Sequence, residues 1–161
     1  MHQVIVLLGG NEGDIKTTFQ QCISKIQTSG FLIEKQSYIY QSKAWGYDSK
    51  NLYFNQALLL KTNHNPQETL HLLLEIEKNL GRTRNSDHGY SDRPIDIDIM
   101  FFDDLSIQTK KLCIPHPRLH LRRFCLVPLN EMVPDFEHPV FKKNIQELLS
   151  ICPDPSELTV V

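Results

Sequence analysis

Apolar and polar positions in the first half of the chain follow the periods of strands and helices. The apolar run from Val4 to Leu8 ends at two glycines, which predicts a buried strand followed by a turn. Apolar residues then recur at helical spacing, and Asp14 stands where it can cap the start of a helix. Segments 31–42 and 53–61 have strand composition, and the polar segment 43–52 between them is typical of a loop.

The second half opens with the best-marked helix of the chain. Asn65 and Glu68 form a capping-box pattern around a proline, and Gly81 supplies a stop, so we predict a helix at about 66–80. Residues 82–94 contain no aliphatic side chain and follow no regular period. This stretch therefore predicts a long loop, and loops of that length usually serve a function.

The remaining pattern predicts the fold class. We expect a strand at 95–102, a further strand that ends at Ile114, and short helices near 118–124 and 143–150. The order strand, helix, strand, strand, helix, strand indicates a ferredoxin-like α+β plait. In this fold a mainly antiparallel sheet is covered by helices, here predicted on one face, with extra elements at the C-terminal end. The length suits one domain, 1–161.

Composition and charge argue against several classes of partner. The 17 basic and 19 acidic residues give a net charge of −2, which is too small to attract nucleic acid or an anionic membrane. The four cysteines are far apart in the sequence and form no C-x-x-C pair, which argues against a zinc site and a secreted disulfide framework. Without a signal peptide or an apolar run of membrane length, we expect a cytoplasmic protein. We expect it to act on small molecules, most simply as a monomer.

Two acids share one face of the predicted strand 95–102. Isoleucines alternate with Asp96 and Asp98, and the two-residue period of a strand places both carboxylates on one side, about 7 Å apart. This spacing suits carboxylates that flank one or two Mg²⁺ ions together with phosphate oxygens. The alternative is a half-buried strand whose solvent face is acidic, and it is the commoner origin of such a triplet.

Arginines in the preceding loop favour the metal interpretation. Arg82, Arg84 and Arg93 lead directly into the acidic strand, and guanidinium groups bind phosphate oxygens in a bidentate manner. A solvated basic loop is the plain alternative. A loop with arginines beside metal-binding acids is, however, suited to closing over a triphosphate and excluding water.

Glu77 occupies a position of the predicted helix where an apolar residue is expected. An inward-facing acid needs a partner. The sequence leaves two possibilities open, a ligand hydroxyl or amine and a nearby arginine such as Arg82.

Aromatic and amide groups predict a site for a flat ligand. Tyr53 and Asn55 are two residues apart on a strand, so an aromatic plane and an amide share one face. That pair suits a flat polar heterocycle, although a sheet-surface aromatic beside an ordinary asparagine is the more frequent case. Trp45 and Tyr90, both in predicted loops, can cover the same ligand or pack beneath the loops.

A second cationic group follows the last predicted strand. His116 lies between two prolines, and Arg122 and Phe124 come shortly after it, so this corner is a candidate nucleotide contact. The other histidines, including His64, His71 and His138, have no zinc-ligand spacing and are interpreted as surface residues. The glycine-rich GGNEGD segment lacks the G-K-[ST] of a P-loop, so any ATP must bind by another route.

Taken together, these motifs resemble the 6-hydroxymethyl-7,8-dihydropterin pyrophosphokinase family of folate biosynthesis. Four blocks match in order, LGGNEGD, Tyr53-Phe54-Asn55, GRTR to DRPIDIDIMFFD, and IPHPRLHLRRF. They span residues 7–130. The resemblance implies that pyrophosphate moves from ATP to a pterin hydroxymethyl group, with release of AMP.

The resemblance also implies residue roles. Asp96 and Asp98 match the magnesium ligands, and Arg82 and Arg93 match the catalytic arginines that bind the triphosphate. The implied pterin-binding positions are Ser42, Lys43, Trp45, Tyr53, Asn55, Tyr90 and Phe124. The implied ATP-binding positions are Glu77, Arg84, Ile99, Lys111, Cys113, His116 and Arg122.

Several positions depart from the common family pattern. Ser42, Lys43 and Trp45 stand where Thr, Pro and Leu are frequent, and Lys111 and Cys113 replace frequent Arg and Thr. None of these changes removes a metal ligand.

Two rival functions remain, a γ-phosphoryl kinase of another small alcohol and a non-catalytic plait-fold module that binds RNA or a small regulator.

Overall fold

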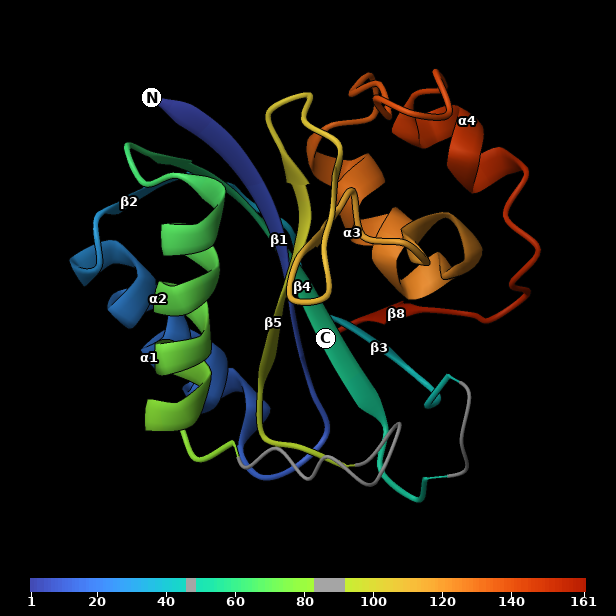
Figure 1. The fold of residues 1–161 in the computed structure, drawn as a ribbon. Coiled ribbons are helices and arrows are strands. Elements are labelled where there is room, and N and C mark those ends of the chain that lie inside the picture. Colours follow the sequence, from blue (N-terminus) through green and yellow to red (C-terminus); the bar gives the residue numbers. More distant parts are fainter. Residues whose placement is uncertain (46–48, 83–91) are drawn as a thin grey trace.

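The computed structural model describes residues 1–45, 49–82 and 92–161 (Figure 1). The three longest strands of its main sheet are β1 His2–Gly10, β4 Tyr53–Thr62 and β5 Asp96–Phe102, with β5 at one edge. β1 lies between the other two and is antiparallel to both. The apolar run predicted to end at the glycines therefore continues as a strand through Gly10.

The outer part of the sheet is built along the free edge of β4. β2 Phe31–Gln36 pairs with one end of β4 and β3 Tyr40–Ser42 with the other, so the expected strand 31–42 is interrupted. The interruption coincides with a tertiary contact, because the backbone N–H of Tyr38 leaves the sheet and donates to a carboxylate oxygen of Glu131 at 2.9 Å. The short strand β8 Thr159–Val160, which the sequence did not predict, pairs with β3.

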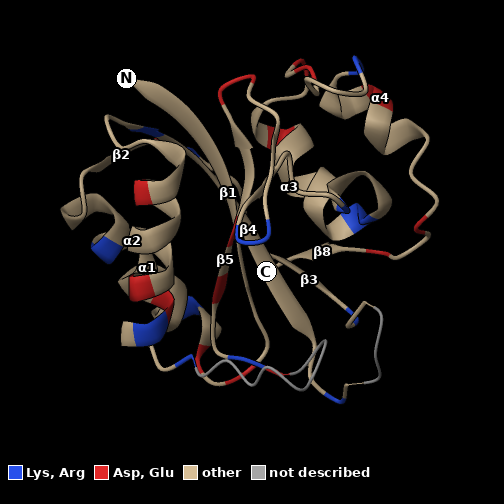
Figure 2. Cartoon of the chain, in the orientation of Figure 1, with Lys and Arg blue, Asp and Glu red and all other residues tan. Residues whose placement is uncertain are grey.

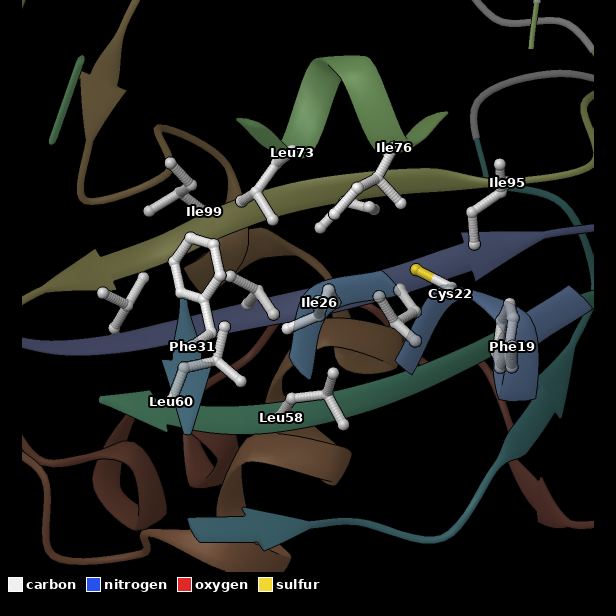
Figure 3. Packing of buried hydrophobic residues seen from close by; sticks show 14 of the residues in the cluster. Phe19, Cys22, Ile26, Phe31, Leu58, Leu60, Leu73, Ile76, Ile95 and Ile99 are labelled. Atoms are coloured by element: carbon white, nitrogen blue, oxygen red, sulfur yellow. The ribbon is translucent and has the colours of Figure 1, made fainter. Parts of the chain in front are cut away.

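Two helices cover one face of the sheet, and both are capped as predicted. Asp14 accepts the Thr17 N–H at the start of α1 Ile15–Thr28, and Asn65 and Glu68 form the capping box of α2 Pro66–Asn79. Figure 3 shows side chains of α1 and α2 meeting side chains of the sheet in the larger core. The residues labelled there include Phe19, Ile26, Leu58, Leu73, Ile76 and Ile99.

The opposite face of the sheet is also covered, which corrects the expectation of helices on one face only. α3 Arg123–Met132 and α4 Ile145–Ser150 lie on this side (Figure 1), and they enclose a second core with side chains of the sheet. The helix expected at 118–124 is wrong in its bounds, because only a 3-10 turn, Leu119–Leu121, precedes α3. A proline inside a helix costs about 3 kcal/mol, and α3 keeps Pro128 because its apolar side is buried against the sheet.

The fold is the predicted ferredoxin-like α+β plait with additions. The strand order β5-β1-β4, with β2 and β3 beside β4, is antiparallel throughout. β6 Ile107–Gln108 and β7 Cys113–Ile114 form a small separate sheet, in agreement with the strand expected to end at Ile114. Among the described residues, no helix has the length and apolar character needed to cross a membrane.

His138 is buried, so its interpretation as a surface residue is wrong. Its ring stacks on Phe141 at 4.2 Å between centroids and meets Phe101 edge-on at 5.6 Å. Its Nδ1 accepts the N–H groups of Val140 and Phe141. Burial lowers the pKa of His138 to about 4, so the ring is neutral and contributes to the second core as an aromatic group.

Replacing Asp154 by alanine is expected to lower the free energy of unfolding by about 1 kcal/mol at neutral pH, as for the loss of a helix cap. Its carboxylate accepts the Arg123 N–H at 3.0 Å, at the start of α3, and also binds Ser156. Burial alone would raise the pKa of Asp154, but the hydrogen bonds from Ser156 and Arg123 outweigh it and lower the pKa. The stabilisation is therefore present above the unfolded-state pKa, about 4, and is lost as the pH falls through the folded-state pKa.

Urea denaturation of the wild type and of Asp154→Ala from pH 7 down to acid checks this prediction. Asp135→Ala, which removes an exposed acid, serves as the control. A difference between wild type and Asp154→Ala that does not shrink in acid would contradict the assigned role of the carboxylate.

Candidate active site

The two acids of β5 point to the same side of the sheet, as predicted. Asp96 and Asp98 line one cavity, whereas the isoleucines at 95, 97 and 99 belong to the core beneath α1 and α2. Figure 2 shows the acidic positions of β5 in the middle of the molecule, with basic positions close to the start of that strand. The alternation of β5 therefore separates the apolar core from a polar site.

Gly9 lies between Asp96 and Asn55 in the sheet and leaves room for both side chains. In the sheet it pairs with Asp96 on one side and with Asn55 on the other. A Cβ atom at Gly9 would lie 2.6 Å from Asp96 Oδ1 and 3.0 Å from Asn55 Nδ2. Asp96 and Asn55 can therefore keep these places only if the residue between them is glycine.

Asn55 is held so that one side of its amide remains available. Its Nδ2 donates to the carbonyl oxygen of Leu8 at 3.2 Å. Its Oδ1 is buried and has no hydrogen-bond partner in the described part of the protein. A buried acceptor without a donor is costly, so this oxygen is suited to a ligand N–H group.

Arg93 joins the acids to the aromatic side of the cavity. Its Nε lies 3.1 Å from Asp96 Oδ2 and also donates to the Tyr53 hydroxyl. Asn11 fixes its backbone, since the Arg93 N–H donates to Asn11 Oδ1 at 2.8 Å and the Asn11 N–H donates to the Arg93 carbonyl at 2.9 Å. Burial alone would lower the pKa of the guanidinium, but Asp96 and Tyr53 outweigh it and raise the pKa. Arg93 is thus a permanent cation.

Glu77 connects α2 to the middle of the acid pair. It is 2% exposed, and its Oε1 accepts from Nη1 of Arg82 at 2.8 Å. Its Oε2 accepts the backbone N–H of Ile97, between the two acids, also at 2.8 Å. Of the two possibilities that the sequence left open, the structure shows the pairing with Arg82.

Asp98 carries the less compensated charge of the two acids. Within the described residues, no lysine or arginine forms an ion pair with it. Burial and the carboxylate of Glu77 raise its pKa, while Arg93, Arg82 and Arg122 offset part of the rise. A carboxylate in this environment gains from any cation that enters the cavity.

The cavity brings together most of the predicted site residues. It has a volume of about 290 Å³ and opens between the sheet, the start of α3 and the end of β3. The predicted residues in its lining are Lys43, Trp45, Tyr53, Asn55, Arg82, Arg93, Asp96, Asp98, His116, Arg122 and Phe124.

A groove of about 410 Å³ continues from this cavity. Its lining includes Ile99, Lys111 and Cys113, three of the positions implied to bind ATP. Asp98 and His116 line both the cavity and the groove. The two spaces therefore meet at an acid and an imidazole.

The imidazole of His116 can act as a neutral hydrogen-bond donor. Its Nδ1 accepts the backbone N–H of Arg118 at 3.2 Å. Burial, with Arg122 and Arg118 nearby, lowers the pKa of His116 to about 4. In the neutral ring the proton must then reside on Nε2, which can donate to a ligand oxygen.

Comparison with known proteins finds pterin pyrophosphokinases among the relatives of this chain. The family model described as 7,8-dihydro-6-hydroxymethylpterin-pyrophosphokinase (HPPK) matches residues 5–134. The chain belongs to this family. The 2-amino-4-hydroxy-6-hydroxymethyldihydropteridine pyrophosphokinase of Aquifex aeolicus is 40% identical over 148 residues, covering 91% of this chain and 90% of that protein. The enzyme of the same name from Bacillus subtilis is 38% identical over 133 residues, covering 82% and 78%.

Solved structures agree on the fold. A structure described as HPPK-DHPS in complex with substrates superposes with a TM-score of 0.75 at 15% identity. A Plasmodium falciparum HPPK-DHPS with SDX-DHP gives a TM-score of 0.70 at 18% identity. This chain spans 43% of each of these chains, which are thus more than twice the length of the matching part. At such low identity the likeness supports the plait fold alone.

Membership of the HPPK family defines the reaction. The chain is an ATP-dependent diphosphokinase of folate biosynthesis that transfers pyrophosphate from ATP to 6-hydroxymethyl-7,8-dihydropterin. The family resemblance seen in the sequence is confirmed. The family assignment disfavours both rivals, the γ-phosphoryl kinase and the binding module.

Three further residues predicted to belong to the site are not among the described residues that line the cavity. Ser42 is buried and is not among the residues that line the cavity, and its hydroxyl has no hydrogen-bond partner in the described part of the chain. Arg84 and Tyr90 lie outside the described residues.

Gly9 and Asn11 are structural parts of the site that the sequence analysis did not single out. The signal was present, because both belong to the LGGNEGD block.

The Glu77→Gln variant is expected to unfold with a free energy lower by about 2 kcal/mol, the cost of leaving a buried donor unpaired. The amide keeps one acceptor, whereas the carboxylate serves both Arg82 and the Ile97 N–H. Thermal denaturation should show a drop in Tm of about 5 °C. Glu75→Gln, on the exposed side of the same helix, is the matched control. Equal Tm values for the two variants would contradict a structural role for Glu77.

Proposed function

We propose that the transfer takes place where the cavity and the groove meet, with the pterin in the cavity and the nucleotide along the groove. The shared lining of the two spaces by Asp98 and His116 carries this proposal. It puts the reacting end of each substrate beside the same acid. Tyr53, Asn55 and Phe124 surround the pterin side, and Lys111 and Cys113 lie on the nucleotide side.

We propose that Asp96 and Asp98 hold Mg²⁺, most simply two ions. The donor set fits this ion, because carboxylate oxygens are its preferred protein ligands and it retains water and phosphate oxygens for the remaining positions. Among the described residues, no group of three or more His, Cys, Asp or Glu side chains could hold a metal, so an all-protein cage is not offered there. The cavity that both acids line and the poorly compensated charge of Asp98 agree with a cation at this point. When bound, the metal supplies positive charge against the phosphate oxygens.

Each residue of the site would then have a separate role in binding or positioning the substrates. Arg82 and Arg93 present guanidinium groups to the triphosphate, and Arg93 is aligned by Asn11 and Asp96. Neutral His116 donates from Nε2 to a phosphate oxygen. The pterin hydroxyl attacks the β-phosphorus in line, and AMP leaves. Positioning and fixed charge supply most of the acceleration, as in other phosphoryl transfers.

Asp98 is a candidate acceptor for the proton of the pterin hydroxyl. A carboxylate bound to Mg²⁺ is a weak base, so a water molecule is the alternative acceptor. We also expect that residues 1–161 act as one domain, as a monomer, in the cytoplasm.

Separating the nucleotide products by chromatography tests the proposed reaction. Purified protein, Mg-ATP and 6-hydroxymethyl-7,8-dihydropterin should produce AMP and a diphosphorylated pterin in equal amounts. ADP and a monophosphorylated product would instead indicate γ-phosphoryl transfer. Absence of turnover with both substrates and Mg²⁺ would support a binding module.

A further inference from the structure

Trp45 and Arg122 form a contact that links two walls of the cavity. The Arg122 Cζ atom lies 4.6 Å from the centroid of the Trp45 ring and 5.6 Å from that of Phe124. Trp45 follows β3, whereas Arg122 and Phe124 stand at the start of α3. The guanidinium group therefore meets aromatic faces from both sides of the cavity.

The charge of Arg122 acts at the point where cavity and groove meet. The residue is 7% exposed, so its charge is poorly screened by water. His116, which lines both the cavity and the groove, is near enough to Arg122 for this charge to contribute to its lowered pKa. A shift of the guanidinium would therefore alter the potential where the two spaces meet.

We propose that Trp45 is a positioning residue for Arg122. The Trp45 ring holds the Arg122 guanidinium group by a cation–π contact, at a place where its positive charge stabilises the nucleotide phosphates. The indole ring offers the strongest cation–π face among the aromatic side chains. The site thus couples Trp45, on the pterin side, to the affinity for ATP. This inference rests on the proposed placement of the two substrates.

Fluorescence of the free protein tests the contact without any substrate. Trp45 is the only tryptophan of the chain, so its emission reports on this ring alone. Arg122→Gln should change the emission maximum and intensity, because the guanidinium next to the ring is lost. Arg123→Gln removes the same charge one residue later, outside the cavity lining, and should leave the emission unchanged. Equal spectra for wild type and Arg122→Gln would overturn the contact.

Steady-state kinetics tests the positioning role. Trp45→Leu keeps an apolar side chain but removes the aromatic face, and we expect the KM for ATP to rise about tenfold, in line with a partly desolvated cation–π contact. Trp45→Phe keeps an aromatic face and should recover most of this loss, whereas simple packing predicts the same KM for both variants. Equal KM values for Trp45→Leu and Trp45→Phe would overturn the positioning role.

Two further controls separate this inference from the proposed function. Circular dichroism and Tm establish that both Trp45 variants fold. If the wild type produced no AMP, the proposed function would fail while the fluorescence result still decided the contact.

Discussion

Asp98→Asn should lower kcat by about a thousandfold, because it removes a ligand of the metal that offsets the charge of the transferred group. The same change should not lower the Tm of the metal-free protein. Burial and Glu77 raise the pKa of Asp98, so its charged form opposes folding at neutral pH, and a neutral amide removes that cost. Loss of activity with an unchanged or higher Tm is a signature that a purely structural residue would not give.

Asp104→Asn is the matched control for this prediction. Asp104 is an exposed acid just after the same strand, and its replacement should change neither kcat nor Tm. Turnover of Asp98→Asn within a few fold of the wild type would remove Asp98 from the proposed metal site.

Gly9→Ala should lower turnover by about a hundredfold, the usual effect of displacing a reacting group by an ångström. The added methyl group would lie 2.6 Å from Asp96 Oδ1 and 3.0 Å from Asn55 Nδ2. Both atoms are at the ends of side chains, so they can move aside and the chain can still fold. The displaced groups would then bind the metal and the pterin in the wrong places.

Gly10→Ala provides a contrasting control one residue away. There the new Cβ would lie 2.4 Å from the backbone carbonyl oxygen of Pro94, which cannot move without shifting the chain that leads into β5. We therefore expect a large loss of stability for Gly10→Ala, measured by Tm, and a loss of activity at nearly normal Tm for Gly9→Ala. Full activity of Gly9→Ala would contradict the role assigned to Gly9 in placing Asp96 and Asn55.

Spacing patterns within short segments of the sequence were sufficient to predict part of the fold. The caps at Asp14 and Asn65, the alternation through Asp96 and Asp98, and the strand order of a plait all follow from spacing along the chain. Where the structure departs from prediction, tertiary contacts are the cause. Pro128 stands inside α3 because burial against the sheet outweighs the cost of a proline in a helix.

The same distinction holds for the site. Residue types and spacing were sufficient to find the acids, the arginines and the aromatic groups, since each has a direct chemical role. Gly9 was not singled out in this way, and for Glu77 the sequence left two partners open, because both roles depend on contacts across the fold. Gly9 lets Asp96 and Asn55 keep their places, and Glu77 binds Arg82 and the amide of Ile97.

The most direct test of the central claim is a crystal structure with Mn²⁺, the pterin and an ATP analogue that cannot be cleaved between the α- and β-phosphorus atoms. We expect anomalous signal from the metal beside the carboxylates of Asp96 and Asp98, with the pterin on the Tyr53 side and the nucleotide along Lys111 and Cys113. Metal bound by the phosphates alone, with both acids turned away, would contradict the account.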